Sequence, residues 1–218
     1  MTVPCFAPLP SLAYNSNMQN PNTATHRFRE RLIVGITGAS GALYGVRLLE
    51  ALHALDVETH LVISEPGQVT LALEMECTPE DLEPLVARRY APNDFAAAIA
   101  SGSFATRGMI IAPCSIRTLS AIAHSHTDDL ISRAADVTLK EGRQLLLMVR
   151  ETPLHLGHLR LMVQATELGA IIFPPVPAFY THPHTIEDLV QQTVGRVLSR
   201  MGFANTLYTP WDPHPETD

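Results

Sequence analysis

The stretch RLIVGITGASGALYGVRLLEAL, residues 31–52, decides the fold. Residues 32–36 form an apolar run typical of a buried strand, and residues 43–52 carry apolar side chains at helical spacing. A turn of small residues, from Gly38 to Gly41, joins the two. Such a turn between a strand and a helix directs backbone N–H groups and the positive end of the helix at one place. The stretch therefore predicts a site for an anion, with phosphate as the first candidate.

The remainder of the chain alternates apolar runs with amphipathic segments. Strands are expected at residues 31–37, 58–64, 107–112, 144–150 and 170–173. Helices are expected at residues 41–55, 66–75, 79–87, 92–100, 116–124, 128–142, 157–168 and 185–201. This order predicts an α/β fold in which helices cover both faces of a parallel sheet, and ligands of such folds bind at the carboxyl ends of the strands. Functional residues are thus expected in the loops that follow the strands.

Composition narrows the class of protein. A chain of 218 residues with 46% hydrophobic residues can bury one good core, so one domain is expected. Its net charge of −7 argues against a general binder of nucleic acid or of membrane surfaces. No apolar run approaches the roughly 18 residues needed to span a bilayer, and no secretion signal is recognisable. Three widely spaced cysteines indicate no disulfide framework, so the cytoplasm is the expected location.

The glycine turn leaves alternatives open. Its glycines, at positions 35, 38, 41 and 45, do not follow the G-x-G-x-x-G spacing of a dinucleotide site, which weakens a nicotinamide reading. Glu65, near the end of the second strand, could still meet a ribose in that reading. A tight turn without any ligand is the third possibility.

A second loop of the same kind follows the strand at 107–112. The segment APCSIRT, residues 112–118, again leads from a strand into a helix and places Ser115 and Thr118 in the first turn. Two such loops in one sheet suit a single phosphate-bearing cofactor. Cys114 in this loop could be a nucleophile, but no partner base is evident, and a small buried thiol is the commoner role.

The histidines and the charged residues each have two readings. Histidine pairs such as His155 and His158 suggest zinc, yet no carboxylate or cysteine completes a recognisable ligand set, and packing or capping roles are favoured. Lys140 is the only lysine and could meet a phosphate together with arginines, or it could be an exposed lysine that pairs with Asp136 or Glu141. Arg150 and Glu151 end a buried strand, as an active-site pair or as a structural ion pair.

Five segments together closely resemble the UbiX family of flavin prenyltransferases. They read VGITGASGALYGVRLL, PCSIRTLSAIAHSHTDDLISRAADVTLKE, LLMVRETPLHLGHLRLM, GAIIFPPVPAFY and QTVGRVL, and the resemblance runs from about residue 31 to about residue 211. It implies a flavodoxin-like, Rossmann-like three-layer fold that binds reduced FMN. The implied reaction transfers the dimethylallyl group of dimethylallyl monophosphate to N5 and C6 of the flavin, without a metal. The prenylated FMN would serve UbiD-type decarboxylases, including the one in ubiquinone biosynthesis, and the enzyme would be a homododecamer.

The resemblance also implies roles for individual residues. The implied flavin-binding residues are Gly38, Ala39, Ser40, Gly41, Ser64, Ser115, Ile116, Arg117, Thr118 and Arg150. Ser40, Glu74 and Glu151 would lie at the reacting atoms as catalytic residues. Those implied to hold the prenyl phosphate are Arg133, Lys140, Tyr180 and Arg196. Arg117 stands where many members have lysine, and Tyr90 where some have tryptophan.

The expected domain organisation and two rival functions complete the sequence reading. Residues 1–29 lack periodicity and are expected to be a flexible extension, residues 30–205 the flavoprotein domain, and residues 206–218 a C-terminal tail. One rival is an FMN-dependent decarboxylase of the phosphopantothenoylcysteine type, although the relevant loop here reads PCSIRT instead of a PASANT-like sequence. The other is a protein that only carries FMN or stabilises a decarboxylase.

Overall fold

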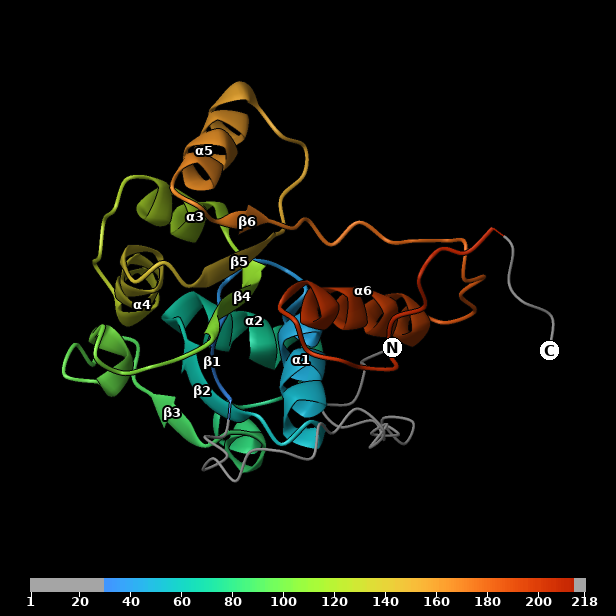
Figure 1. The fold of residues 1–218 in the computed structure, drawn as a ribbon, viewed down its shortest axis with the longest axis horizontal. Helices are drawn as coiled ribbons and strands as arrows, with labels where there is room; N and C mark the ends of the chain where they lie inside the picture. The colour runs from blue at the N-terminus through green and yellow to red at the C-terminus, as the bar shows by residue number, and fades with distance from the viewer. Residues whose placement is uncertain (1–29, 214–218) are drawn as a thin grey trace, which may run out of the picture.

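The computed structural model describes residues 30–213, and a parallel sheet forms the centre of this part of the chain (Figure 1). The sheet has six strands in the order β3-β2-β1-β4-β5-β6, and every neighbouring pair is parallel. The strands are β1 (Arg31–Ile36), β2 (Glu58–Ile63), β3 (Arg88–Tyr90), β4 (Gly108–Cys114), β5 (Gln144–Val149) and β6 (Ile171–Ile172). The predicted parallel sheet is therefore confirmed.

Helices cover both faces of this sheet, which gives the three-layer, flavodoxin-like fold that was expected. The α-helices are α1 (Ala42–Ala54), α2 (Glu65–Met75), α3 (Ile116–Ala123), α4 (Leu130–Lys140), α5 (Leu156–Glu167) and α6 (Ile186–Arg200). Leu32, Val34 and Ile36 of β1 face the core that α1, α2 and α6 complete. Ile33 faces a second core, completed by α3, α4 and α5. Because the central strands are buried on both faces, they read in the sequence as continuous apolar runs.

The chain reverses its direction of travel across the sheet at β1. From β1 it passes to β2 and β3 on one side, and it then returns to β4, β5 and β6 on the other. β1 and β4 are neighbours with Val34 opposite Ile110, so the loops that follow them start side by side. In open α/β sheets such a switch point forms a crevice at the carboxyl ends of the strands. The fold therefore places the two small-residue loops next to each other.

Two sequence predictions of local structure were wrong, and one strand was missed. Residues 79–87 contain the 3-10 helix η2 (Glu80–Leu85) instead of an α-helix, since Pro84 within it lacks an N–H group. Most of 92–100 forms turns before the short 3-10 helix η3 (Ala98–Ala100), and the Asp94 carboxylate there accepts a hydrogen bond from the N–H of Ala96. The strand β3 was not predicted at all.

An arm, residues 173–185, leaves the end of β6 and runs along the outside of α6 to its N-terminal end (Figure 1). The chain returns beside α6 as the C-terminal segment, residues 206–213, the described part of the predicted tail. The prediction of a flexible extension falls on residues 1–29, which lie outside the described residues.

The structure also bears on two expectations drawn from the whole sequence, one about disulfides and one about membrane-spanning helices. Cys77 is disulfide-bonded, which corrects the expectation that the cysteines would form no disulfide. Among residues 30–213, no helix combines the length and the apolar character that a bilayer crossing requires.

Candidate active site

A pocket of about 200 Å³ opens at the carboxyl ends of the strands. Five of the residues that line it are flavin-binding residues implied by the family resemblance: Gly38, Ser64, Ser115, Arg117 and Thr118. The sequence reading missed the other five, which are Pro66, Ala121, Asp128, Asp129 and Ser132. The structure thus brings the loops after β1, β2 and β4 together with the start of α4 around one cavity.

Three helix N-termini face this pocket, each with a side-chain cap. The Ser64 hydroxyl accepts a hydrogen bond from the Gly67 N–H of α2 (3.1 Å), and the Ser115 hydroxyl accepts one from the Thr118 N–H of α3 (3.3 Å). Asp129 caps α4 by accepting from the Ser132 N–H at 2.7 Å. Helix N-termini carry partial positive charge and attract anions. Their convergence suits a phosphate group better than a cation or an apolar ligand.

Thr37 fastens the two predicted loops to each other. Its buried hydroxyl donates to the carbonyl oxygen of Pro113 (2.7 Å) and accepts from the N–H of Ser115 (2.8 Å). One side chain at the end of β1 thereby fixes the backbone after β4. A threonine that directly follows an apolar strand is a weak signal in a sequence, and its partners lie 76 and 78 residues away.

The glycine turn itself holds a carboxylate of the same chain. One oxygen of Glu74 accepts hydrogen bonds from the N–H groups of Gly41 (2.8 Å) and Ala42 (2.9 Å), at the N-terminus of α1. Gly41 has a φ of 105°, a backbone conformation that favours glycine. Glu74 therefore occupies the N–H groups that the sequence reading assigned to a ligand anion. Gly38, the other end of the turn, lines the pocket and packs so closely on Pro66 that a Cβ atom would collide there.

The remaining flavin-binding and catalytic candidates surround this region. Ser40 is exposed within the glycine turn, next to Ala39. Ile116, between Ser115 and Arg117, packs against the second core. Arg150 and Glu151 are exposed at the carboxyl end of β5, where the Arg150 N–H donates to the Cys114 carbonyl (3.1 Å).

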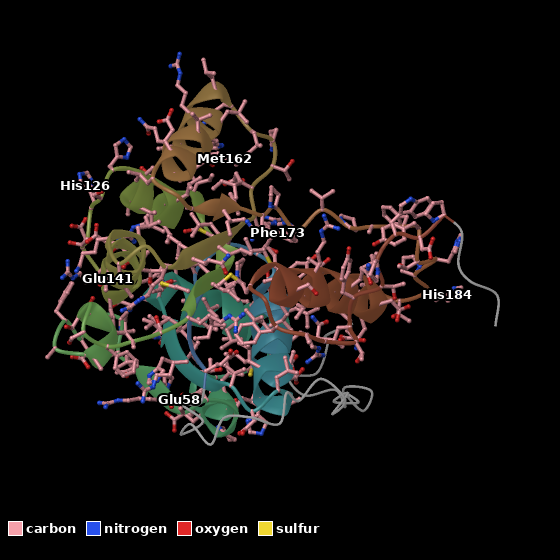
Figure 2. The ribbon with its side chains drawn as sticks, viewed as in Figure 1. Glu58, His126, Glu141, Met162, Phe173 and His184 are labelled. Atoms are coloured by element: carbon pink, nitrogen blue, oxygen red, sulfur yellow. The ribbon has the colours of Figure 1, made fainter. Side chains whose placement is uncertain are left out.

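The four candidates for binding the prenyl phosphate fall into separate groups within one chain. Arg133 pairs with Asp136 (3.3 Å) on α4, and Lys140, at the far end of that helix, pairs with Glu141 (2.6 Å). α4 has 11 residues, so its C-terminal end lies about 16 Å from the end that faces the pocket. Figure 2 shows Glu141 and His184 on opposite sides of the molecule, the latter in the arm that carries Tyr180.

Tyr180 and Arg196, in contrast, are drawn to one place by the C-terminal segment. The Tyr180 hydroxyl donates to the carbonyl oxygen of Thr209 at 2.8 Å. Arg196 donates to the Tyr208 hydroxyl at 3.3 Å. One chain therefore holds Tyr180 of the arm and Arg196 of α6 against the C-terminal segment, and it holds the other two candidates on α4.

The structure also separates the roles that were open for cysteine and histidine. Burial raises the pKa of the Cys114 thiol strongly and keeps it protonated, which is the property of a packed thiol and the opposite of an activated nucleophile. His155 caps α5 by accepting from the Gly157 N–H (3.0 Å), and the His158 ring lies tilted against its ring. Among the described residues, no group of three or more histidine, cysteine, aspartate or glutamate side chains is placed to hold a metal ion.

Comparison with known proteins identifies the family. The Flavoprotein family matches residues 20–198. The flavin prenyltransferase UbiX of Escherichia coli strain K12 is 59% identical over 179 residues, which cover 82% of this chain and 94% of that protein.

Two solved structures are similar in fold and in sequence. The AnUbiX structure in complex with FMN and dimethylallyl pyrophosphate has a TM-score of 0.83 and 48% identity, covering 84% of this chain and 98% of that one. A dodecameric FMN-dependent UbiX-like decarboxylase from Escherichia coli O157:H7 has a TM-score of 0.81 and 46% identity, covering 84% and 99%. A PPC decarboxylase mutant, at 18% identity and a TM-score of 0.57, shares only the fold. The chain belongs to the UbiX family of flavin prenyltransferases, within the wider Flavoprotein family.

Proposed function

We propose that this protein transfers the dimethylallyl group of dimethylallyl monophosphate to reduced FMN, forming bonds at N5 and C6 and releasing phosphate. The observation that carries the proposal is the pocket at the β1–β4 switch point, in a chain 59% identical to a flavin prenyltransferase. Its donors fit FMN, because capped helix N-termini, serine and threonine hydroxyls and Arg117 are the groups that bind a phosphate and a polyol.

The residues of the chain divide into three roles in this proposal. Ser64, Ser115, Arg117 and Thr118 hold FMN at the pocket, and residues 38–41 and Arg150 border it. Reduced FMN supplies the nucleophilic N5 and C6 atoms for the prenyl group. A carboxylate near the reacting atoms then accepts a proton, for which Glu151 is exposed at the end of β5, with Ser40 in the adjacent turn.

Cations and aromatic rings complete the chemistry on the prenyl side. The departing phosphate gains charge as its bond to the allylic carbon breaks, so guanidinium and ammonium groups that bind it lower the barrier. Arg196, Arg133 and Lys140 supply such groups. Tyr180 presents a π face that suits the developing allylic cation.

Assembly into an oligomer is part of the proposal. A pocket of about 200 Å³ is smaller than the roughly 300–1,000 Å³ of most small-molecule sites, so one chain supplies only part of the cavity. Leu156, Leu159 and Val163 form an exposed apolar stripe on α5, and exposed apolar patches mark interaction surfaces. With a dodecameric relative of 46% identity, we expect a homododecamer in which neighbours bring Lys140 and Arg133 to a shared site.

The product is expected to serve a UbiD-type decarboxylase as its cofactor, and the reaction is expected to take place in the cytoplasm. The first expectation comes from the family resemblance. The second comes from the sequence, and the disulfide of Cys77 removes the cysteine pattern from its support. The rival function of the phosphopantothenoylcysteine decarboxylase type gains no support beyond a shared fold, because the PPC decarboxylase likeness stands at 18% identity.

The deciding experiment mixes the purified protein with reduced FMN and dimethylallyl monophosphate under anaerobic conditions. The flavin should gain the mass of one five-carbon C5H8 unit, with one phosphate released per flavin modified. Parallel reactions with dimethylallyl diphosphate determine the phosphate preference, and reactions without protein give the background. Unmodified flavin in the complete mixture would contradict the proposal and would leave an FMN carrier as the better description.

A further inference from the structure

The C-terminal segment contacts two residues that the proposed function assigns to the prenyl substrate: Tyr180 to the allylic group and Arg196 to the phosphate. Tyr180 donates its hydroxyl proton to the Thr209 carbonyl (2.8 Å), and the Trp211 ring meets the Tyr180 ring edge-on with centroids 5.3 Å apart. Arg196 lies 5.7 Å from the Tyr208 ring centroid and donates to the Tyr208 hydroxyl. The segment therefore touches the arm and α6 at the same time.

Gln192 of α6 ties these parts together. Its side chain is only 7% exposed, and its amide makes three hydrogen bonds. The nitrogen Nε2 donates to the Tyr180 hydroxyl (3.1 Å) and to the Thr209 carbonyl (2.9 Å), and the oxygen Oε1 accepts from the Thr209 N–H (3.0 Å). Because a backbone N–H can only donate, the amide orientation is fixed by Thr209 and leaves Nε2 facing the tyrosine.

This arrangement also fixes the direction of the Tyr180 hydroxyl. The single proton of the phenol goes to the Thr209 carbonyl, and one lone pair accepts from Gln192. The ring is thereby held at its polar end by two partners on different segments and at its edge by Trp211. We call the hydrogen bonds that join Gln192, Tyr180 and Thr209 the clamp. Arg196 lies four residues after Gln192 on α6, one helical turn away, so the clamp also sets the distance between Tyr180 and Arg196.

We propose that Gln192 is a positioning residue for substrate binding. It holds the side chains of Tyr180 and Arg196 at a fixed distance from each other through the C-terminal segment. The inference rests on the proposed function, since it assumes that Arg196 binds the prenyl phosphate and that the Tyr180 ring faces the allylic group. Gln192 itself is buried, and its amide bonds only Tyr180 and Thr209, so we assign it no direct contact with the substrate. Groups that bind the substrate equally in the ground and transition states affect KM more than kcat. Loosening the clamp is therefore expected to raise KM for dimethylallyl monophosphate.

The main test replaces Gln192 with leucine, which has a similar size and no hydrogen-bonding groups. Gln191→Leu is the matched control, because Gln191 is the adjacent residue and its amide bonds Glu187 instead of the C-terminal segment (3.1 Å). In Gln192→Leu we expect KM for dimethylallyl monophosphate to rise about tenfold, as the loss of one to two hydrogen bonds implies, with kcat within threefold of wild type and FMN content unchanged. The control should keep the wild-type KM.

A spectroscopic signal reports on the clamp independently of turnover. Trp211 is the only tryptophan of the chain, so the anisotropy of tryptophan emission from the intact flavoprotein measures the mobility of the C-terminal segment. We expect lower anisotropy in Gln192→Leu than in wild type and in Gln191→Leu. Equal anisotropy and an unchanged KM in Gln192→Leu, or a fall in kcat alone, would overturn the inference.

A second variant covers the case in which Gln192→Leu does not fold. Thr209→Pro removes the backbone donor to Gln192 at an exposed residue and leaves the buried glutamine in place. It should raise KM and lower Trp211 anisotropy in the same direction, and wild-type values for both would refute the clamp. A wild-type enzyme without prenyl transfer would instead refute the proposed function together with this inference. An active wild type with unaffected variants refutes the inference alone.

Discussion

Glu74 is the residue whose role the structure defines most closely, because its carboxylate binds two N–H groups at the start of α1. Glu74→Ala leaves both groups without this partner and should lower the free energy of unfolding by about 1–3 kcal/mol. Glu74→Gln keeps an acceptor oxygen and loses only the charge at a helix N-terminus, so about 0.3–1 kcal/mol is expected. Urea unfolding measures both values. Glu76→Gln, at an exposed carboxylate nearby, is the control and should change little.

The two glutamates assigned to proton transfer differ in what a charge-neutral substitution should do. Glu151 is exposed at the end of β5, so Glu151→Gln should keep the stability and FMN content of wild type. If this carboxylate accepts the proton, prenylation slows by about 10²-fold or more, and single-turnover kinetics measure the rate. If Glu74 accepts the proton instead, Glu74→Gln is the variant that slows to this degree. Wild-type rates in both variants would assign the proton to the released phosphate.

His60 links stability to pH through its burial between β1 and β3. Desolvation lowers its pKa, although Glu58 partly opposes this, and its ring bonds the Tyr90 hydroxyl (2.9 Å). Below the unfolded value of about 6.5, the unfolded chain gains a proton that the folded chain resists. The unfolding free energy should thus fall as pH drops from about 6.5 toward 5, with a slope of at most about 1.4 kcal/mol per pH unit from this group. In His60→Gln, denaturation across this pH range should show a flatter dependence, and an unchanged slope would argue against the assignment.

At the scale of the element, the N-terminus of α4 offers a matched pair of variants. Asp128 and Asp129 are adjacent and both line the pocket, but Asp129 forms the capping box with Ser132. Asp129→Ala should lower the unfolding free energy by about 1 kcal/mol and weaken FMN binding, because the frayed turn no longer borders the cavity. Asp128→Ala should leave stability within about 0.5 kcal/mol. Equal losses in the two variants would show that charge at the pocket, not the cap, is responsible.

The elements that could be predicted from the sequence are those whose pattern of apolar residues matches their burial in the fold. β1, β4 and β5 are buried on both faces and therefore read as apolar runs, as does the second half of β2, residues 61–63. Ser64 and Ser115 stand at the cap positions that follow strands. β3 is three residues long with two arginines, so no apolar period marks it. The helix predicted at 92–100 gave way to a turn at Asp94, whose side chain offers the backbone an alternative partner.

The site was predictable only where it follows a strand. Asp129 and Ser132 lie after the α3–α4 connection, and although their spacing fits a helix cap, nothing local places that cap at the pocket. Glu74 reaches Gly41 across 33 residues, and Gln192 reaches Thr209 across 17. Contacts of this kind depend on how helices pack, which periodicity does not encode. The family resemblance supplied Glu74 as a site residue, and the structure supplied the groups that it bonds.

At the scale of the whole molecule, the exposed apolar stripe of α5 leads to a prediction about the mass of the oligomer. α5 stands at the outer edge of the described part of the chain, with Met162 on it in Figure 2, and its inner side packs against the second core. Light scattering should give about twelve times the chain mass of 23.9 kDa. Leu159→Asp, which puts a charge into the stripe, should yield smaller species.

The control for this prediction is Gln164→Asp, which adds the same charge at an exposed polar position of α5. It should keep the mass of wild type. A wild-type protein that scatters as a monomer at micromolar concentration would contradict the dodecamer, and a Leu159→Asp variant of full mass would move the interface away from α5.

Because Lys140 is the single lysine, amine-directed chemistry addresses one side chain of the chain, apart from the α-amino group. Its side chain is about half exposed at the end of α4, so reagents can reach it in an isolated chain. Acetylation removes the charge while reductive methylation keeps it, which separates the electrostatic part of the role of Lys140 from its steric part in unmutated protein. Peptide mass spectrometry then measures the rate at which Lys140 is acetylated. A lysine held at the phosphate site of a neighbouring subunit acetylates more slowly than one facing water, so this rate reports whether Lys140 is part of a subunit contact.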